Sequence, residues 1–520
     1  MSWYNEAVFY HIYPLGLTGA PALNDYGEPV HRLRTIYPWI DHIKDIGCNA
    51  LYIGPLFQSV GHGYETTDYR SLDSRLGTND DLAELVRICH EKGIRVILDG
   101  VFNHTGRDFF AFRDIQANRE NSRYRDWYCN VNFWGNNEYN DGFSYDNWGG
   151  YNLLAKLNQR NPEVRDYLLD TVRFWVSEFD IDGIRLDAAD VLDFDFMKAL
   201  RDLADHIKED FWLMGEVIHG DYSRWANSRT LHSVTDYQLH KALYSAHNDH
   251  NYFEIAHTVR RHEELGLRDI RLYNFADNHD VERIYTRLRN KAHFMPLHIL
   301  LYSLPGIPSI YYGSEFGIEG RKERGSDASL RPELHLEQMQ DNVCSELIRA
   351  LGRIHLEEKA LVYGDYQELQ LTTTQYAFSR GDVIISVNNS DAEAGFDVPG
   401  SGTYHGALYC GEAVSDGGRV RFTIPGCSGE IWIPEGREWK YEPISAAPMP
   451  VEEEPAEAAY TEPKRAADPG KPYEEMSIEE LQAEILAKMA ANGPVTDRMK
   501  QDVIENVYRD SLLNWVKSFR

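Results

Sequence analysis

The sequence predicts an α/β fold: a (β/α)8 TIM barrel with an inserted loop domain after strand 3, a C-terminal antiparallel β-domain and a tethered helical hairpin. From about residue 8 to 355, short apolar runs alternate with longer amphipathic stretches, as parallel strands do when each is followed by a covering helix. From 358 to 440 the pattern changes to short alternating strands with Gly-rich turns. Because 520 residues exceed the roughly 250–300 at which a single core stops growing, we expect at least two domains.

Eight apolar runs supply the barrel strands, and the barrel is predicted over residues 1–103 and 158–357. The runs lie near residues 8–13, 50–54, 94–99, 181–187, 211–216, 233–237, 271–275 and 308–312. Between them, Thr78 and Asp81 resemble a capping box, and Gly93 suits the position after a helix. Another helix is predicted to begin at Asn161-Pro162. Eight such strand and helix units favour closure into a barrel.

The inserted domain is predicted over residues 104–157, a stretch rich in Asn, Tyr, Trp, Phe and Gly that is too long for an ordinary connection. Loops at that end of a barrel usually shape the active site. We expect most of its aromatic side chains to form a small core, with some left as sugar platforms. Its acids Asp141 and Asp146, with Asn147, are expected in a solvated loop rather than at a calcium ion.

The C-terminal third is predicted to hold an antiparallel β-domain (358–440), a flexible acidic linker (441–475) and a helical hairpin (476–520). The linker is rich in Pro, Ala and Glu, a composition that buries too little surface to order itself. Beyond it, Ser477 and Glu480 resemble a capping box, and Leu481, Ile485 and Met489 share one face. So short a hairpin needs a partner surface, so we expect self-association or protein docking through residues 476–520.

Composition excludes several classes of function. With 82 acidic and 53 basic residues, the formal charge of −29 disfavours binding to nucleic acid or an anionic membrane. The six cysteines show no C-x-x-C spacing, which predicts free thiols rather than disulfides or a zinc site. No leader and no run of about 18 apolar residues is evident, so a cytoplasmic protein is expected.

Three of the predicted strands end in an acid: Asp187, Glu216 and Asp280. Residues two apart in a strand face the same side, so Arg185 and Asp187 point the same way. We expect the arginine to lower the pKa of Asp187 and keep it ionised as a nucleophile. Burial after an apolar run is expected to raise the pKa of Glu216, which then holds a proton for a leaving oxygen. One protonated and one ionised acid together can cleave a glycosidic bond.

Four blocks then resemble the α-amylase superfamily of retaining glycoside hydrolases: DGVFNH at 99–104, GIRLD at 183–187, GE at 215–216 and NHD at 278–280. Their order and spacing match across some 180 residues, from 99 to 280. The resemblance implies that Asp187 forms a covalent glycosyl-enzyme, Glu216 is the general acid and base, and Asp280 stabilises the charged transition state.

The same resemblance implies further site residues. Residues that grip hydroxyls or carboxylates around the cleaved sugar would be Arg185, His104 and His279. In the string Gly61-His62-Gly63-Tyr64, His62 and Tyr64 would line the subsite of that sugar, with the tyrosine as a stacking platform. Asp99 and Asn103 would support these residues from behind, and Asn103 is a calcium ligand in some relatives.

Two local strings bear on the subclass. Residues 154–158 (LAKLN) look like the segment before strand four in the neopullulanase and cyclomaltodextrinase branch, with Ala155 in place of the usual proline. That branch usually carries an N-terminal domain, which we expect this chain to lack. Many relatives place lysine and histidine after the nucleophile, where this chain has Ala188-Ala189, so a structural calcium is doubtful and the metal ligands are left unassigned. No organic cofactor is required.

Within this superfamily the sequence predicts a retaining α-glucan hydrolase acting on α-1,4-linked maltooligosaccharides, cyclodextrins or starch fragments. A 4-α-glucanotransferase or an α-glucosidase with the same three acids is the alternative enzyme. A catalytically silent glucan-binding scaffold is the alternative of another class, and His62, His104 and His279 could each be an ordinary hydrogen-bonded loop residue.

Overall fold

The computed structural model describes residues 2–323, 326–437, 441–444, 471–473 and 476–492, together with Val503, Leu512 and Val516. The chain divides into two compact units, Met1–Glu452 and Glu453–Arg520, and each is described by itself. No helix in the described part of the chain is long and apolar enough to cross a membrane.

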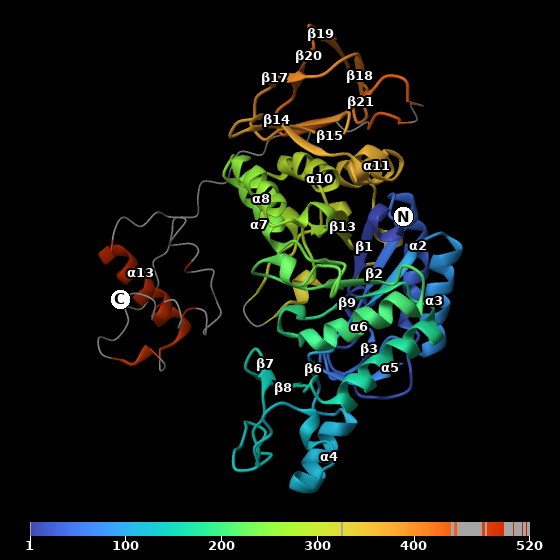
Figure 1. Ribbon diagram of the computed structural model, residues 1–520, viewed down its shortest axis with the longest axis vertical. Helices are drawn as coiled ribbons and strands as arrows, with labels where there is room; N and C mark the ends of the chain where they lie inside the picture. Colours follow the sequence, from blue (N-terminus) through green and yellow to red (C-terminus); the bar gives the residue numbers. More distant parts are fainter. Residues whose placement is uncertain are drawn as a thin grey trace. The chain divides into compact units, whose positions relative to one another are not determined.

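Eight parallel strands form the barrel of the first unit (Figure 1). In spatial order they are β11 (Ser233–Val234), β10 (Trp212–Gly215), β9 (Gly183–Leu186), β5 (Arg95–Gly100), β2 (Ala50–Ile53), β1 (Phe9–Ile12), β13 (Ile307–Tyr311) and β12 (Tyr273–Phe275). The two end strands meet through a parallel bridge between Thr235 and Tyr273, and the Asp236 N–H donates to the Tyr273 carbonyl at 2.9 Å. The eight strands and the barrel predicted from the sequence are therefore confirmed.

Helices follow most of these strands: α1 (Pro14–Leu17), α2 (Tyr37–Asp45), α3 (Asn79–Glu91), α5 (Pro162–Phe179), α6 (Phe194–Ile207), α7 (Tyr237–Asn248), α8 (Phe253–Glu264), α9 (Ile284–Arg287), α10 (Phe294–Ser303), α11 (Val343–Glu357) and α12 (Lys359–Tyr363). The capping box of Thr78 and Asp81 and the helix start at Asn161-Pro162 are both confirmed.

The connection from β10 to β11 departs from the predicted pattern, because it contains the short 3-10 turn η6 (Tyr222–Arg224) in place of a covering helix. The Asp221 side chain accepts from the Ser223 N–H and closes this tight turn. The prediction of eight complete strand and helix units is wrong at this position.

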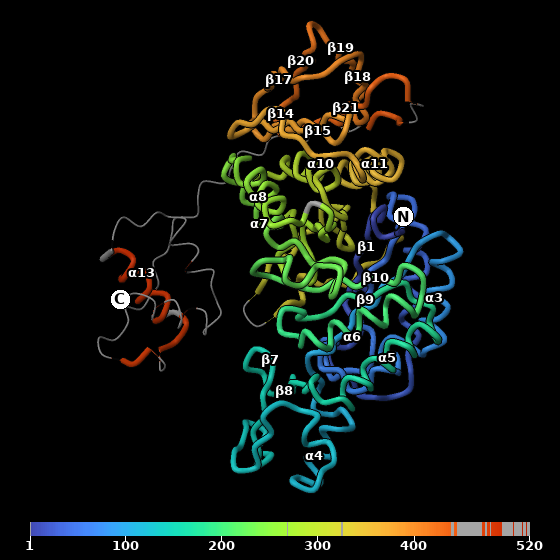
Figure 2. The backbone as a smooth tube through the Cα atoms, viewed as in Figure 1, coloured from blue at the N-terminus to red at the C-terminus, as the bar shows by residue number. Residues whose placement is uncertain are grey.

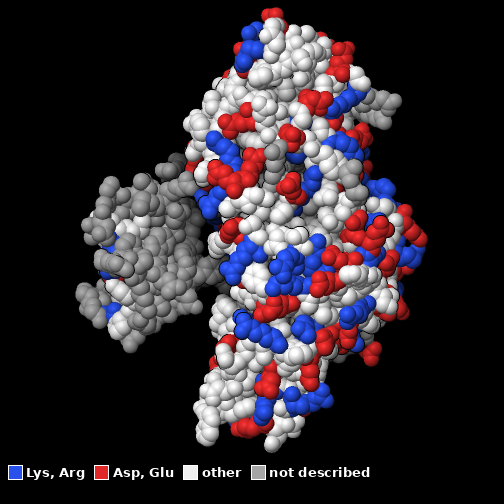
Figure 3. All heavy atoms as spheres, viewed as in Figure 1, with Lys and Arg blue, Asp and Glu red and all other residues white. Residues whose placement is uncertain are grey.

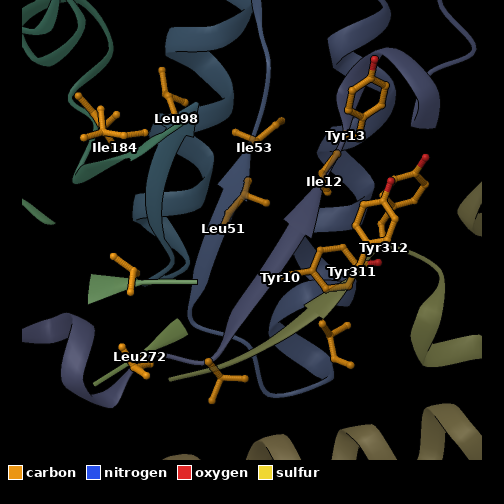
Figure 4. Packing of buried hydrophobic residues seen from close by; sticks show 14 of the residues in the cluster. Tyr10, Ile12, Tyr13, Leu51, Ile53, Leu98, Ile184, Leu272, Tyr311 and Tyr312 are labelled. Carbon is orange, nitrogen blue, oxygen red and sulfur yellow. The ribbon is translucent and has the colours of Figure 1, made fainter. Parts of the chain in front are cut away.

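Alternation along the strands sorts apolar side chains into two cores, since successive residues of a strand face opposite sides. Tyr10, Ile12, Leu51 and Ile53 belong to the large core shared with the surrounding helices (Figure 4). The residues between them on the same strands, together with others such as Trp212 and Met214, fill the barrel interior: Phe9, Ala50, Tyr52, Ile97, Tyr273, Phe275 and Ile307. The interior is thus packed solid, and functional side chains must lie at its ends.

Two smaller sheets flank the barrel strands within the first unit. Strands β3 (Phe57–Ser59) and β4 (Thr66–Leu72) precede α3, and the inserted segment after β5 contains β6 (His104–Thr105), α4 (Phe110–Asn118), the 3-10 turns η3 (Arg119–Asn121) and η4 (Arg125–Trp127), β7 (Asn147–Trp148) and β8 (Tyr151–Lys156). Figure 2 shows the backbone leaving the barrel for this segment and returning to it before α5. The chain order therefore puts the insertion directly after the strand that carries Asp99.

The antiparallel β-domain is confirmed. Its strands are β14 (Tyr366–Leu371), β15 (Gln375–Arg380), β16 (Val383–Asn388), β17 (Ala394–Pro399), β18 (Thr403–Gly406), β19 (Glu412–Asp416), β20 (Arg419–Ile424) and β21 (Ser428–Pro434). They pair in the order β14-β15-β16-β21-β18-β19-β20-β17. The predicted domain boundaries themselves stay a prediction.

In the second unit, α13 (Ile478–Asn492) starts at the predicted capping box, where the Ser477 hydroxyl accepts from the Glu480 N–H at 3.2 Å and the Ser477 N–H donates to the Glu480 carboxylate at 2.7 Å. Most of the predicted linker and of the second half of the hairpin lies outside the described residues. Leu481 and Ile485 are buried in one apolar cluster with Met476, Val503, Leu512 and Val516. This cluster covers the apolar face of α13 within its own unit, and the expected self-association or docking through residues 476–520 stays a prediction.

Candidate active site

Strand alternation carries polar side chains from the barrel interior to its C-terminal rim. On β5, Ile97 fills the interior and Asp99 lies two residues further on; on β10, Trp212 and Met214 precede Glu216 in the same way. Asp99 is paired in register with Arg185 of β9. The Glu216 N–H donates to the Leu186 carbonyl at 2.9 Å, so Glu216 lies level with Asp187 on the neighbouring strand.

The Arg185 guanidinium joins three of the acids. Its Nη1 lies 2.8 Å from Asp99 Oδ1 and 3.0 Å from Asp187 Oδ1, and its Nη2 lies 2.8 Å from Glu216 Oε2. The Ala188 N–H, directly after Asp187, also donates to Glu216 Oε2 at 3.1 Å. The two carboxylates predicted to act on the glycosidic bond are therefore neighbours around one cation.

The fourth acid joins this group through Tyr64. The Tyr64 hydroxyl donates to Asp99 Oδ2 at 3.2 Å and shares a second hydrogen bond with His279 Nε2. His279 Nε2 lies 3.1 Å from Asp280 Oδ2. The structure thus brings together the three predicted catalytic acids with Arg185, Tyr64, His279 and Asp99.

Asp280 has a second cationic partner that the sequence analysis missed, Arg331. Its Nη2 lies 2.9 Å from Asp280 Oδ1, its Nε donates to the His279 carbonyl at 2.9 Å, and its guanidinium lies 4.6 Å from the centre of the Tyr13 ring. Arg331 follows the last barrel strand by some twenty residues of irregular chain, and no periodic pattern identified it.

Tyr237 is a further residue that the sequence analysis passed over. Its hydroxyl donates to Glu216 Oε1 at 3.3 Å and accepts from the Asn278 amide at 3.1 Å. A signal for it was present, because Tyr237 ends the run that predicted the sixth barrel strand, and strand ends at this rim supply the other site residues.

The predicted histidines differ in their surroundings. The His62 side chain is 51% exposed and its Nε2 lies 3.2 Å from Glu65, while the Tyr13 hydroxyl donates to its backbone carbonyl at 2.5 Å. His104 is buried, its Nδ1 accepts from the Asn103 amide at 3.1 Å, and its Nε2 has no hydrogen-bond partner in the described part of the protein. The His62 side chain is therefore partly open to solvent, whereas His104 is buried and its ring is positioned by the Asn103 side chain.

Burial and charge set the pKa values in this cluster. Burial raises the pKa of Asp187 and of Glu216, and the Arg185 charge opposes both shifts. Burial would also raise the pKa of Asp280, but His279, Arg331 and Arg185 outweigh it and lower that pKa to about 2. Burial lowers the pKa of both His104 and His279 to about 3, so both rings are neutral at pH 7.

Arg185 does lower the pKa of Asp187, as expected, but burial raises that pKa by more. Arg185 also neutralises Asp99 and Glu216, so its charge is divided among three acids. Asp187 is only 8% exposed, and loss of water is the larger effect on its pKa. The prediction of a raised pKa for Glu216 agrees with the structure.

The described residues show no carboxylate cluster for a calcium ion. Among the described residues, no three His, Cys, Asp or Glu side chains gather in a way that could hold a metal ion. Asn103 Oδ1 is a buried acceptor without a partner, but Ala188 and Ala189 after the nucleophile position offer no side-chain ligand. In the inserted segment, Asp141 pairs instead with Arg107 at 2.6 Å. The six cysteines are free thiols, as predicted.

Comparison with known proteins agrees with this geometry. A family model described as "Alpha amylase, catalytic domain" matches residues 27–355. A cyclomaltodextrinase of Thermoanaerobacter pseudethanolicus is 31% identical over 420 residues, which cover 75% of this chain and 71% of that protein. An intracellular maltogenic amylase of Bacillus subtilis is 31% identical over 345 residues, 62% of this chain and 57% of that protein.

Among solved structures, an acarbose-soaked debranching enzyme of Nostoc punctiforme superposes with a TM-score of 0.70 at 28% identity, over 83% of this chain and 98% of that one. The family model covers more than half of the 520 residues and includes every acid around Arg185 as well as Asp280. The chain therefore belongs to the α-amylase family of glycoside hydrolases.

Proposed function

We propose that the protein hydrolyses α-1,4-glucosidic bonds of maltooligosaccharides, cyclodextrins or short starch fragments, with retention of anomeric configuration. The observation that carries this proposal is the Arg185 guanidinium, which holds Asp187 and Glu216 side by side with Nη contacts of 3.0 and 2.8 Å. A retaining glycosidase uses two neighbouring carboxyl groups roughly 5–5.5 Å apart, one as nucleophile and one as acid, and the shared guanidinium supports such a pairing.

The chemistry assigned to these residues has two steps. Glu216 gives its proton to the glycosidic oxygen while an Asp187 oxygen bonds to the anomeric carbon, and the aglycone leaves as an alcohol. In the second step the Glu216 carboxylate takes a proton from water, the water oxygen bonds to the same carbon, and the bond to Asp187 breaks. Asp280, ionised at neutral pH, stabilises the positive charge that develops on the sugar in both steps.

The protonation states are assigned from the roles that the two steps require, because burial raises the pKa of Asp187 as well as that of Glu216. Around Arg185 three carboxylates face one positive charge, and burial raises the pKa of each of them. We assign the proton that this cluster retains to Glu216. Asp99 is instead suited to stay ionised, because its carboxylate accepts hydrogen bonds from the Tyr52 and Tyr64 hydroxyls.

Hydrolysis of maltoheptaose, β-cyclodextrin and pullulan by the purified full chain tests the proposal. Release of reducing ends is expected, with a loss of at least ~10³-fold in kcat for Asp187→Asn and for Glu216→Gln. Asp166→Asn, on an exposed acid of α5, is the matched control and keeps full activity. If the wild-type protein binds maltoheptaose but releases nothing, the scaffold alternative replaces the enzyme.

The same two-step chemistry also allows a transferase or an α-glucosidase, because sugar in place of water can accept the glycosyl group. Products longer than the maltotriose substrate would indicate transfer, and release of single glucose units from chain ends would indicate a glucosidase. Because the similar protein from Nostoc punctiforme is named a debranching enzyme, α-1,6 bonds are a further candidate substrate. Cleavage of pullulan to panose or to maltotriose separates the two linkages.

Two further proposals concern the whole chain. We propose that residues 476–520 form a tethered docking module, supported by their separate compact unit and its own apolar cluster. An unchanged number of protomers per particle after deletion of residues 453–520 would contradict self-association. We also propose a cytoplasmic location, supported by the free cysteines and by the relative named an intracellular maltogenic amylase.

The surface charge disfavours nucleic acid as a partner. Acidic and basic side chains are interspersed on the face drawn in Figure 3, and the net charge of the chain is −29.

A further inference from the structure

The inserted segment contains a β-hairpin that carries two exposed aromatic rings at its tip. Trp148 on β7 pairs directly with Tyr151 on β8, and the two residues between them, Gly149 and Gly150, have φ of 62° and 85°. Two consecutive positive φ values form the tight turn that suits a hairpin. Directly paired residues place their side chains on the same face of the ribbon, so both rings project from one face of the hairpin tip.

The stem of this hairpin is held in place by polar contacts. The Asn147 amide donates to Asn152 Oδ1 at 2.7 Å, and the Tyr145 hydroxyl donates to the Asn152 carbonyl at 2.6 Å. Arg107 in turn donates to the Tyr145 hydroxyl at 2.9 Å and pairs with Asp141. The tip therefore presents its rings at a fixed position, although Trp148 is 40% and Tyr151 63% exposed.

The hairpin is continuous with the catalytic cluster. Its strand β8 pairs with β6, where His104 faces Lys156, and the Trp148 ring centre lies 6.2 Å from that of His104. His104 is buried with its Nε2 lacking a partner, and it lies beside the Tyr64 backbone. His104, beside the Tyr64 backbone, thus connects the catalytic cluster to the Trp148 ring, and Tyr151 pairs with Trp148 at the tip. Figure 1 shows β6, β7 and β8 together in the inserted segment, away from the antiparallel β-domain.

Glucose units match such a pair of rings chemically. A pyranose ring has an apolar face of C–H groups that packs on an aromatic ring, while its edge hydroxyls stay in water. Exposed apolar side chains that are grouped together can mark a ligand-binding surface. We propose that Trp148 and Tyr151 form a platform for glucosyl units beyond the one whose bond is cleaved, and that this platform sets a preference for long over short α-glucans. This inference rests on the proposed function.

Trp134 supplies a matched control. It belongs to the same inserted segment and is 99% exposed, but it lies in the loop bounded by the bridge between Asn132 and Ser144, outside the β7 and β8 hairpin. Loss of an exposed tryptophan as such is therefore tested by Trp134→Ala, and loss of the platform by Trp148→Ala and Tyr151→Ala.

The experiment compares kcat/KM for maltoheptaose with kcat/KM for maltotriose. The ratio of the two is expected to fall about 10-fold in Trp148→Ala and further in the double variant with Tyr151→Ala, because one aromatic contact contributes roughly a factor of ten to binding. It is expected to stay within about two-fold in Trp134→Ala and to recover in Trp148→Phe, which keeps a ring. Calorimetry with the Glu216→Gln protein gives a reading free of catalysis, and Trp148→Ala is expected to raise the Kd for maltoheptaose about 10-fold.

An unchanged ratio and an unchanged Kd in Trp148→Ala would overturn the platform while leaving the proposed function in place. Failure of the wild-type protein to cleave any α-glucan would instead overturn the proposed function. An equal fall of the ratio in Trp134→Ala would also reject the platform, because the effect would then come from any exposed ring of the segment.

Discussion

Replacement of Arg185 by lysine removes the group that holds the three acids together. The guanidinium contacts Asp99 and Asp187 through Nη1 and Glu216 through Nη2, at 2.8 to 3.0 Å. A lysine ammonium is a single point and cannot reach both sides of this fork. Contacts to two of the carboxylates are lost, and each buried charged hydrogen bond contributes a net ~1.5–3 kcal/mol. The total of about 3–6 kcal/mol corresponds to a loss of roughly 10²–10⁴ in kcat/KM.

The pH profile gives this prediction a direction. Arg185 lowers the pKa of Asp187 against the effect of burial, so a weaker cation lets that pKa rise further. A nucleophile works in its ionised form, so the acid limb of kcat/KM in Arg185→Lys moves to higher pH. The assay is the pH dependence of kcat/KM on maltoheptaose, with chemical unfolding in parallel to confirm that the variant is folded. Activity within about three-fold of wild type, with an unmoved acid limb, would refute the reasoning.

Three further perturbations have defined outcomes. Arg331→Gln removes one charged contact to Asp280, so kcat should fall about 10- to 100-fold with little change in KM. Arg331→Lys should recover part of the lost kcat. A kcat of Arg331→Gln equal to wild type would contradict a role of Arg331 in holding Asp280. Asp182 lies at the N-terminal end of the barrel, and Asp182→Asn leaves His90 and Lys208 without their buried anion. The free energy of unfolding should fall by about 3–5 kcal/mol, while kcat should stay near wild type. The Asp182 pKa is lowered to about 2, below that of the unfolded chain. This stabilisation is therefore present above about pH 4 and is lost as the pH falls toward 2. Thermal unfolding measured across that pH range would detect the loss. Dialysis against EDTA should leave kcat and Tm unchanged, since the donor set does not form a cation site, and a loss restored by Ca²⁺ would overturn that conclusion.

The barrel and the convergence of the candidate acids at one rim could be predicted because both depend on local periodicity. Alternation within a strand fixes that Arg185 and Asp187 share a side, and parallel strands bring their ends to one rim. The register of Asp99 with Arg185 then follows from the pairing of neighbouring strands. The antiparallel β-domain was predictable for the same reason.

Residues held by long-range contacts could not be predicted in this way. Arg331 reaches Asp280 across 51 positions that include α9, α10 and β13, and no spacing rule connects the two residues. The pKa of Asp187 depends on how one guanidinium divides among three acids, which requires their positions in space.

The central claim, a covalent intermediate on Asp187, is tested most directly by trapping it. Glu216→Gln lacks the base for the second step, so a maltosyl fluoride, whose leaving group needs no acid, should accumulate as an ester. Peptide mass analysis is expected to locate one maltosyl group on Asp187, and wild-type protein is expected to release α-configured product. An unlabelled Asp187 together with a β-configured product would contradict the account.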